Sequence, residues 1–198
     1  MNTIRLIIVA VGGQGNLLAA KVLGEAALAA GVPVRMSEIH GMAQRGGVVE
    51  SAVVIGQAGS SLISDGEADI LLGFEPSETL RALGKCHRDT VVITNLAPLP
   101  PFTVAIGKGV YPDLDRVQAL IREKTKRLIA FDAVALAKAA GNVMALNMVL
   151  LGALIETGLL PITAEEVQTA IRTKTKADLA KVNLQAFALG MEAAQKAA

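Results

Sequence analysis

The chain has 198 residues, enough for one ordinary domain, and its net charge of +1, 3% aromatic content and lack of tryptophan are unlike those of a nucleic-acid binder. Hydrophobic residues make up 52% of the chain, but no apolar run approaches the ~20 residues that a membrane-spanning helix needs. A single cysteine, Cys86, excludes an internal disulfide, and together with two histidines it is too few to hold an iron–sulfur cluster or a structural zinc, so we expect a cytoplasmic protein.

The N-terminal part of the chain predicts a βαβ unit. Residues 4–11 form a short run dominated by β-branched residues, which is typical of a buried strand. Because this strand begins so near the first residue, we expect no signal peptide. A glycine turn over 12–15 leads into a helix over 17–30, which Gly31 ends with a left-handed cap. A second strand from 32 to 36 completes the unit.

The regular alternation of strand and helix then breaks. Residues 38–47 form a polar loop flanked by glycine, and a strand over 48–56 follows it directly, which indicates a β-hairpin insertion. The remaining predicted elements are strands at 68–73, 90–95 and 128–131, helices at 76–83 and 114–125, an extended linker at 97–101, and a mostly helical part capped by Asp132, Asn142 and Thr163. We therefore expect an α/β fold in a single domain: a Rossmann-like, mostly parallel sheet with a β-hairpin insertion and a helical C-terminal part.

The glycine turn carries a possible binding signal. Its residues are Gly12, Gly13, Gln14 and Gly15, in a GxGxxG-like pattern with Ala10 in place of the first glycine. Glycine lets the backbone approach a diphosphate closely, and the following helix N-terminus attracts anions. Glu38, roughly 20 residues further on, would then bind a ribose as in dinucleotide enzymes. Alternatively, these glycines serve only a tight turn and close helix–sheet packing.

The loop after the second strand offers the richest set of functional groups. Arg45 carries a planar guanidinium that matches a carboxylate or phosphate, and Gln44 can donate and accept hydrogen bonds at once. We expect an active-site-facing or partner-facing role for Glu38, His40, Gly41, Met42, Gln44, Arg45, Gly46 and Gly47. The alternative is a solvated loop in which Arg45 pairs with Glu38 or Glu50.

Two of these motifs carry a family resemblance. Residues 11–15 (VGGQG) and 37–47 (SEIHGMAQRGG) resemble the signature of the γ subunit or domain of 2-oxoacid:ferredoxin oxidoreductases. The similarity continues through 68–76, Asn142, Asn147, 151–154 and 182–190, and its C-terminal part is most similar to the small (β) subunit of the indolepyruvate type. The resemblance thus covers 1–198 as one γ-type domain and implies the fold of pyruvate:ferredoxin oxidoreductase domain III. Ala10 departs from the family's usual glycine, which weakens the case for diphosphate contact there.

The resemblance implies a reaction that needs more than this chain. The family decarboxylates a 2-oxo acid oxidatively to an acyl-coenzyme A, using thiamine diphosphate and [4Fe–4S] clusters, and reduces ferredoxin. We expect no cofactor, metal or catalytic residue in this chain alone, and a larger partner subunit that carries the thiamine diphosphate and the clusters. Gln44 and Arg45 would face the partner's substrate or coenzyme A pocket. Without its partner we expect the chain to be inactive and able to pair with a second copy.

Several features have plainer interpretations. The turn at Ser64-Asp65-Gly66 lacks the rest of a thiamine motif and reads as an ordinary turn. Cys86 is expected to be structural, and Met144 and Met148, four residues apart, are expected in the core. Two other function classes stay open: a stand-alone NAD(P)- or nucleotide-binding protein that uses the glycine turn, and an assembly module without a catalytic role.

Overall fold

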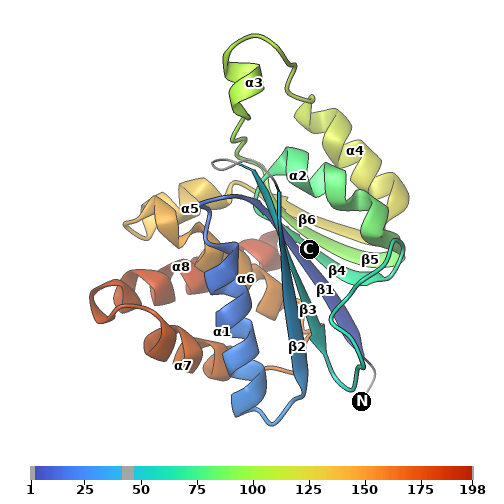
Figure 1. Ribbon diagram of the computed structural model, residues 1–198. Coiled ribbons are helices and arrows are strands. Elements are labelled where there is room, and N and C mark those ends of the chain that lie inside the picture. The colour runs from blue at the N-terminus through green and yellow to red at the C-terminus, as the bar shows by residue number, and fades with distance from the viewer. Residues whose placement is uncertain (1–2, 42–46, 198) are drawn as a thin grey trace.

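A six-stranded sheet with the strand order β2-β3-β1-β4-β5-β6 runs through the molecule (Figure 1). The computed structural model describes residues 3–41 and 47–197. Strands β1, β4, β5 and β6 are parallel, whereas β3 lies antiparallel between β1 and β2. The strands are β1 (Ile4–Val11), β2 (Val34–His40), β3 (Val48–Ile55), β4 (Ala68–Gly73), β5 (Cys86–Asn95) and β6 (Arg127–Phe131).

Helices cover both faces of the sheet. On one face lie α1 (Asn16–Ala29), α5 (Ala133–Ala139), the short 3₁₀ helix η2 (Val143–Ala145), α6 (Leu146–Glu156), α7 (Ala164–Lys174) and α8 (Ala177–Lys196). On the other lie α2 (Pro76–Arg81), the 3₁₀ helix η1 (Ala82–Lys85) and α4 (Leu114–Lys124), while the single turn α3 (Phe102–Ala105) stands away from the sheet (Figure 1). The predicted layered α/β fold with a β-hairpin insertion is confirmed.

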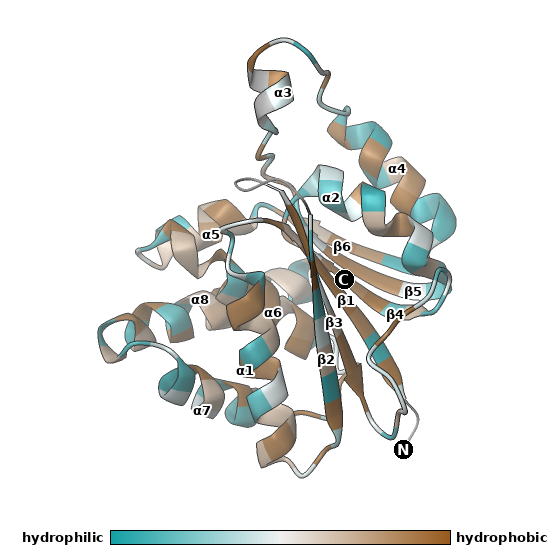
Figure 2. Ribbon diagram, viewed as in Figure 1, coloured by the Kyte–Doolittle hydropathy of each residue, from teal (hydrophilic) through white to brown (hydrophobic). Residues whose placement is uncertain are grey.

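Alternation along β1 divides the core into two parts. Leu6 and Ile8 point toward the face covered by α1 and α5 to α8, and Ile7 and Val9 point toward α2 and α4. All four side chains are buried. Figure 2 shows the central strands as mostly hydrophobic, whereas the edge strand β2 carries hydrophilic positions along its length. The apolar run that the sequence shows at 4–11 is therefore a strand covered on both faces.

Helix α6 is buried on all sides and crosses α8 at close range. Every residue from Leu146 to Ile155 is buried. A Cβ on Gly152 would overlap the carbonyl oxygen of Phe187, and one on Gly190 would overlap that of Val149. The two glycines let the helix backbones touch, which explains how so apolar a helix fits into the core. Of the helices in the described part, none is long and apolar enough to cross a bilayer.

Local signals of the sequence are largely confirmed. The side chains of Asp132 and Asn142 accept hydrogen bonds from Ala135 N (2.8 Å) and Met144 N (2.9 Å), and Thr163 forms a capping box. Gly31 ends α1 with φ 69°. The assignment of Glu38, Ile39 and His40 to a loop is wrong, because β2 continues to His40 and stays paired with β3 along its whole length. Helix α3, next to the extended linker, was also not predicted.

Candidate functional site

The carboxyl ends of the parallel strands meet at one edge of the sheet, which is where ligands bind in open α/β folds. The glycine turn follows β1 at this edge, and both ends of the hairpin loop lie beside it. Gly12 N donates to Gly47 O at 2.8 Å, and Gly41 N donates to Val48 O at 2.8 Å. The two motifs that carry the family resemblance are therefore neighbours in space.

The glycine turn is built from internal contacts. Gln14 Oε1 accepts from Val11 N at 2.8 Å, and Gln14 Nε2 donates to Phe74 O at 3.2 Å, so this side chain joins the ends of β1 and β4. Gly15 has φ 84°, and a Cβ there would lie 2.7 Å from Nδ2 of Asn147, which donates to Gly15 O at 3.2 Å. Close packing thus accounts for Gly15, and contact of the turn with a phosphate stays a prediction.

Residues 42–46 of the hairpin loop lie outside the part of the chain that the structure describes. The expected roles of Met42, Gln44, Arg45 and Gly46, and the proposed pairing of Arg45, therefore stay predictions.

Glu38 and His40 lie on the exposed edge strand β2, with His40 Nε2 3.6 Å from Glu38 Oε2. Strand β3 separates β2 from β1, which puts Glu38 two strand spacings, roughly 10 Å, from the strand that leads into the glycine turn. In a dinucleotide-binding fold the ribose-binding acid follows the strand next to β1, so the hairpin insertion displaces Glu38 from that position.

An apolar pocket of about 390 Å³ opens beside the glycine turn. Its lining residues are Gly12, Gly13, Gln14, Ala97, Pro98, Leu99, Val134, Val143, Met144 and Leu146. Leu99, Val143 and Met144 are 46%, 46% and 59% exposed, so the rim of the pocket is a hydrophobic surface. The expectation that Met144 is a core residue is wrong, because it lies in η2 before α6 begins; Met148, inside α6, is fully buried as predicted.

A buried carboxylate fixes one wall of this pocket. Glu75, 1% exposed, follows β4 and caps α2 by accepting from Glu78 N at 2.9 Å. Its other oxygen, Oε1, accepts from Leu99 N at 3.2 Å and from the Tyr111 hydroxyl. Burial and the hydrogen bond to Glu75 raise the pKa of Tyr111 above its usual value, so the phenol stays protonated as the donor.

Asn95 joins the ends of three strands at the same edge. Its Nδ2 donates to Phe74 O and Ala97 O, both at 3.0 Å, and its Oδ1 accepts from Ala97 N and Ala133 N, both at 3.1 Å. Sequence reasoning missed both Glu75 and Asn95. The only local signal was the acid before Pro76, at the N-cap of a predicted helix.

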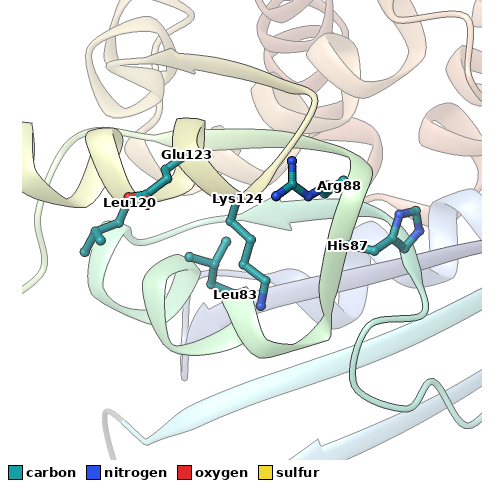
Figure 3. Close-up of a pocket in the computed structure, with 6 residues that line it drawn as sticks. All are labelled: Leu83, His87, Arg88, Leu120, Glu123 and Lys124. Atoms are coloured by element: carbon teal, nitrogen blue, oxygen red, sulfur yellow. The ribbon is translucent and has the colours of Figure 1, made fainter.

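A second pocket lies at the opposite edge, where β5 begins. It measures about 600 Å³ and is lined by Leu83, His87, Arg88, Leu120, Glu123 and Lys124 (Figure 3). Cys86, next to it in the chain, is 2% exposed, and burial raises the pKa of its thiol to about 11 although Lys124 acts in the opposite direction. A protonated, buried thiol agrees with the structural interpretation of Cys86.

A metal ion or a thiamine–metal motif needs a set of ligands at suitable positions. Within 3–41 and 47–197, no group of three or more His, Cys, Asp or Glu side chains is placed to hold a metal ion. Asp65 Oδ1 lies 3.2 Å from Lys85 Nζ, and Gly66 takes φ 73°, as expected for an ordinary turn rather than a thiamine–metal motif.

Comparison with known proteins gives matches along nearly the whole chain. Residues 5–193 match the family described as pyruvate ferredoxin/flavodoxin oxidoreductase. The chain is 41% identical to indolepyruvate oxidoreductase subunit IorB of Pyrococcus horikoshii, covering 99% of this chain and 98% of the relative. It is 42% identical to the IorB of Methanothermobacter thermautotrophicus, covering 93% and 94%.

Solved structures of other proteins share the fold of this chain. The γ subunit of a keto/oxoacid ferredoxin oxidoreductase from Geobacter sulfurreducens superposes with a TM-score of 0.72 at 24% identity, covering 98% of this chain and 99% of that one. A chain of 2-oxoglutarate:ferredoxin oxidoreductase from Magnetococcus marinus gives 0.75 at 19% identity, covering 99% of this chain but 32% of that one. The same fold is thus about a third of a longer chain in the second structure.

Proposed function

The chain belongs to the pyruvate ferredoxin/flavodoxin oxidoreductase family, and on this basis we propose that it is the small, γ-type subunit of an indolepyruvate-type 2-oxoacid:ferredoxin oxidoreductase. The observation that carries the proposal is the 41% identity to an IorB subunit over 98% of that subunit's length. An end-to-end match supports one γ-type domain over 1–198 rather than a shared fragment. We propose that the chain works in the cytoplasm, because its single cysteine is a buried free thiol and free thiols are typical of a reducing compartment.

The proposed complex decarboxylates a 2-oxo acid oxidatively and transfers the acyl group to coenzyme A, while electrons pass singly to ferredoxin. Thiamine diphosphate and [4Fe–4S] clusters would supply the carbanion chemistry and the electron path. One cysteine in 198 residues, and a buried one, cannot ligate such a cluster, so we assign these groups to a larger subunit. The Magnetococcus marinus chain, in which the same fold is joined to a larger remainder, supports that arrangement.

We assign the contact with the larger subunit to the edge that holds the glycine turn. Leu99, Val143 and Met144 expose apolar side chains there, around the 390 Å³ pocket. Burial of such side chains is typical of the centre of a stable interface. When the partner is missing, the same surface is available for pairing with a second copy of this chain.

The hairpin loop would complete the partner's active site. Its base is fixed to the glycine turn by the Gly12–Gly47 hydrogen bond. We propose that Gln44 and Arg45 reach the partner's substrate or coenzyme A pocket, with Arg45 binding an anionic group of the bound molecule. Covering the pocket would also keep water away from the reacting carbon.

Reconstitution with the larger subunit tests these roles. Arg45→Ala should raise KM for the 2-oxo acid or for coenzyme A by about 10- to 100-fold, the loss expected for a hydrogen bond to a charged group. Arg116→Ala, which removes an exposed guanidinium from α4, is the matched control and should leave both KM values unchanged. If Arg45→Ala left turnover and both KM values unaltered, the proposed role of the loop would be wrong.

The same preparation separates the other two function classes. A stand-alone nucleotide-binding protein would gain about 2.7 kcal/mol of stability from NAD(P) at a hundredfold excess over Kd. We expect no such gain, because β3 holds Glu38 away from the ribose position. If activity of the complex survived removal of this chain, the chain would be an assembly module.

A further inference from the structure

A second cavity at the glycine-turn edge lies on the face of the sheet that α1, α6 and α8 cover. It measures about 290 Å³ and lies among the start of α1, the η2–α6 junction and the start of α8. Its polar lining residues are Asn142, Asn147, Lys174, Thr175, Lys176 and Asn183. We propose that this cavity binds a phosphate group.

Two uncapped helix starts line the cavity. Gly15 and Lys176 are the N-caps of α1 and α8, and neither makes a side-chain capping hydrogen bond, whereas α6 continues from η2, which Asn142 caps. By contrast, the starts of α2, α4, α5 and α7 are capped by Glu75, Asp113, Asp132 and Thr163. Free backbone N–H groups and the positive ends of helix dipoles favour an anion at such positions.

The amide of Asn183, a largely buried residue, is free to bind a ligand in the cavity. Asn183, on α8, is 8% exposed and lines the cavity, yet makes no hydrogen bond to any residue in the described part of the chain. No fully buried side-chain N or O atom of the described residues lacks a hydrogen-bond partner, so the Asn183 amide is open to the cavity, where a phosphate oxygen would accept its N–H. The neighbouring Asn147 already donates to Gly15 O at 3.2 Å, and Asn142 accepts from Met144 N at 2.9 Å.

The charge around the cavity fits an anion. Lys176 forms no ion pair among the described residues, and it is exposed at the cavity wall. Lys174 Nζ lies 3.1 Å from Glu25 Oε2, so that charge is already balanced. Asp178, in the first turn of α8, is exposed and does not line the cavity. The volume exceeds that of one water, roughly 30 Å³, by enough to hold a phosphate and part of the group that carries it.

Calorimetric titration of the full chain with inorganic phosphate tests the assignment. Asn183→Leu keeps the size of the side chain but removes the amide, and should weaken phosphate binding about tenfold or more. Lys176→Gln removes a cation at the rim and should weaken it about threefold. Lys181→Gln makes the same charge change on an exposed part of α8 that does not line the cavity, and should leave the Kd unchanged.

Titrations with chloride and malonate at matched ionic strength separate a phosphate site from general attraction of anions. Saturable binding of phosphate, with weaker binding of malonate and the stated order of variants, supports the proposal. Equal affinity for malonate, equal weakening by Lys181→Gln, or no saturable binding of phosphate overturns it. If Asn183→Leu does not fold, the comparison of phosphate affinities between Lys176→Gln and Lys181→Gln tests the proposal. The test needs neither the larger subunit nor turnover, so it can fail while the proposed subunit assignment stands.

Discussion

Replacing Glu75 by glutamine should loosen the wall of the glycine-turn pocket. The wild-type carboxylate accepts three hydrogen bonds, from Glu78 N, Leu99 N and the Tyr111 hydroxyl, at a position only 1% exposed. A glutamine side chain has one oxygen, so its NH₂ group must face one or more of these donors. Either the α2 cap or the contacts that hold Leu99 and Tyr111 are therefore lost.

The structure gives the size of the effect. A lost N-cap costs about 1 kcal/mol and a buried donor left without an acceptor costs about 1–3 kcal/mol, so Glu75→Gln should lower the free energy of unfolding by about 1–3 kcal/mol whichever contact is lost. Urea denaturation measures this directly, and Glu165→Gln, at an exposed acid in the first turn of α7, should change it by less than about 0.5 kcal/mol. A loss below about 0.5 kcal/mol for Glu75→Gln would refute the role assigned to this carboxylate.

Three further predictions follow from buried groups. At pH 8 the Cys86 thiol, with a pKa of about 11, has about one thiolate per thousand molecules, so iodoacetamide should modify the native chain at least about 100-fold more slowly than the urea-unfolded chain; equal rates would contradict its burial. Gly152→Ala, which drives a methyl group into the Phe187 carbonyl, should cost about 2–3 kcal/mol in the same unfolding assay, whereas Gly84→Ala, with open space around it, should be neutral or slightly stabilising. Because the native pKa of Tyr111 is raised, the native state holds its proton more tightly than the unfolded state, and stability should fall above pH ~10 by up to about 1.4 kcal/mol per pH unit; Tyr111→Phe should remove this part of the slope, and an unchanged slope would contradict the Glu75 contact.

The elements that could be predicted are those whose signals are local. The β-branched run of β1, the cap residues Asp132 and Thr163, and the left-handed Gly31 each depend on a few neighbouring residues. The hairpin insertion was predicted because a strand pattern began at Val48 without a preceding helix.

The wrong predictions fall where contacts between distant parts of the chain determine the local structure. Pairing with β3 extends β2 to His40, although the residues there are polar enough for a loop. Met144 repeats the helical spacing of Met148, but the helix begins only at Leu146. The residues that shape the site act over long separations: Glu75 bonds 24 residues ahead to Leu99, and Asn95 bonds 38 residues ahead to Ala133. No local pattern marks such contacts.

The functional assignment likewise combines local sequence motifs with contacts between distant residues. The VGGQG and HGMAQRGG motifs were recognised in the sequence, and only the structure shows that the Gly12–Gly47 hydrogen bond joins them at one edge. The cavity lined by Gly15, Lys176 and Asn183 could not be foreseen, because it forms where α1, α6 and α8 begin.

Anaerobic purification of this chain, tagged at its native level of expression and with iron and thiamine assayed in the eluate, tests the subunit assignment most directly. We predict that a stoichiometric larger subunit carrying both iron and thiamine diphosphate co-purifies with the chain, and 2-oxo acids can then be screened on that complex. Recovery of the chain alone, with neither iron nor thiamine, would contradict the assignment.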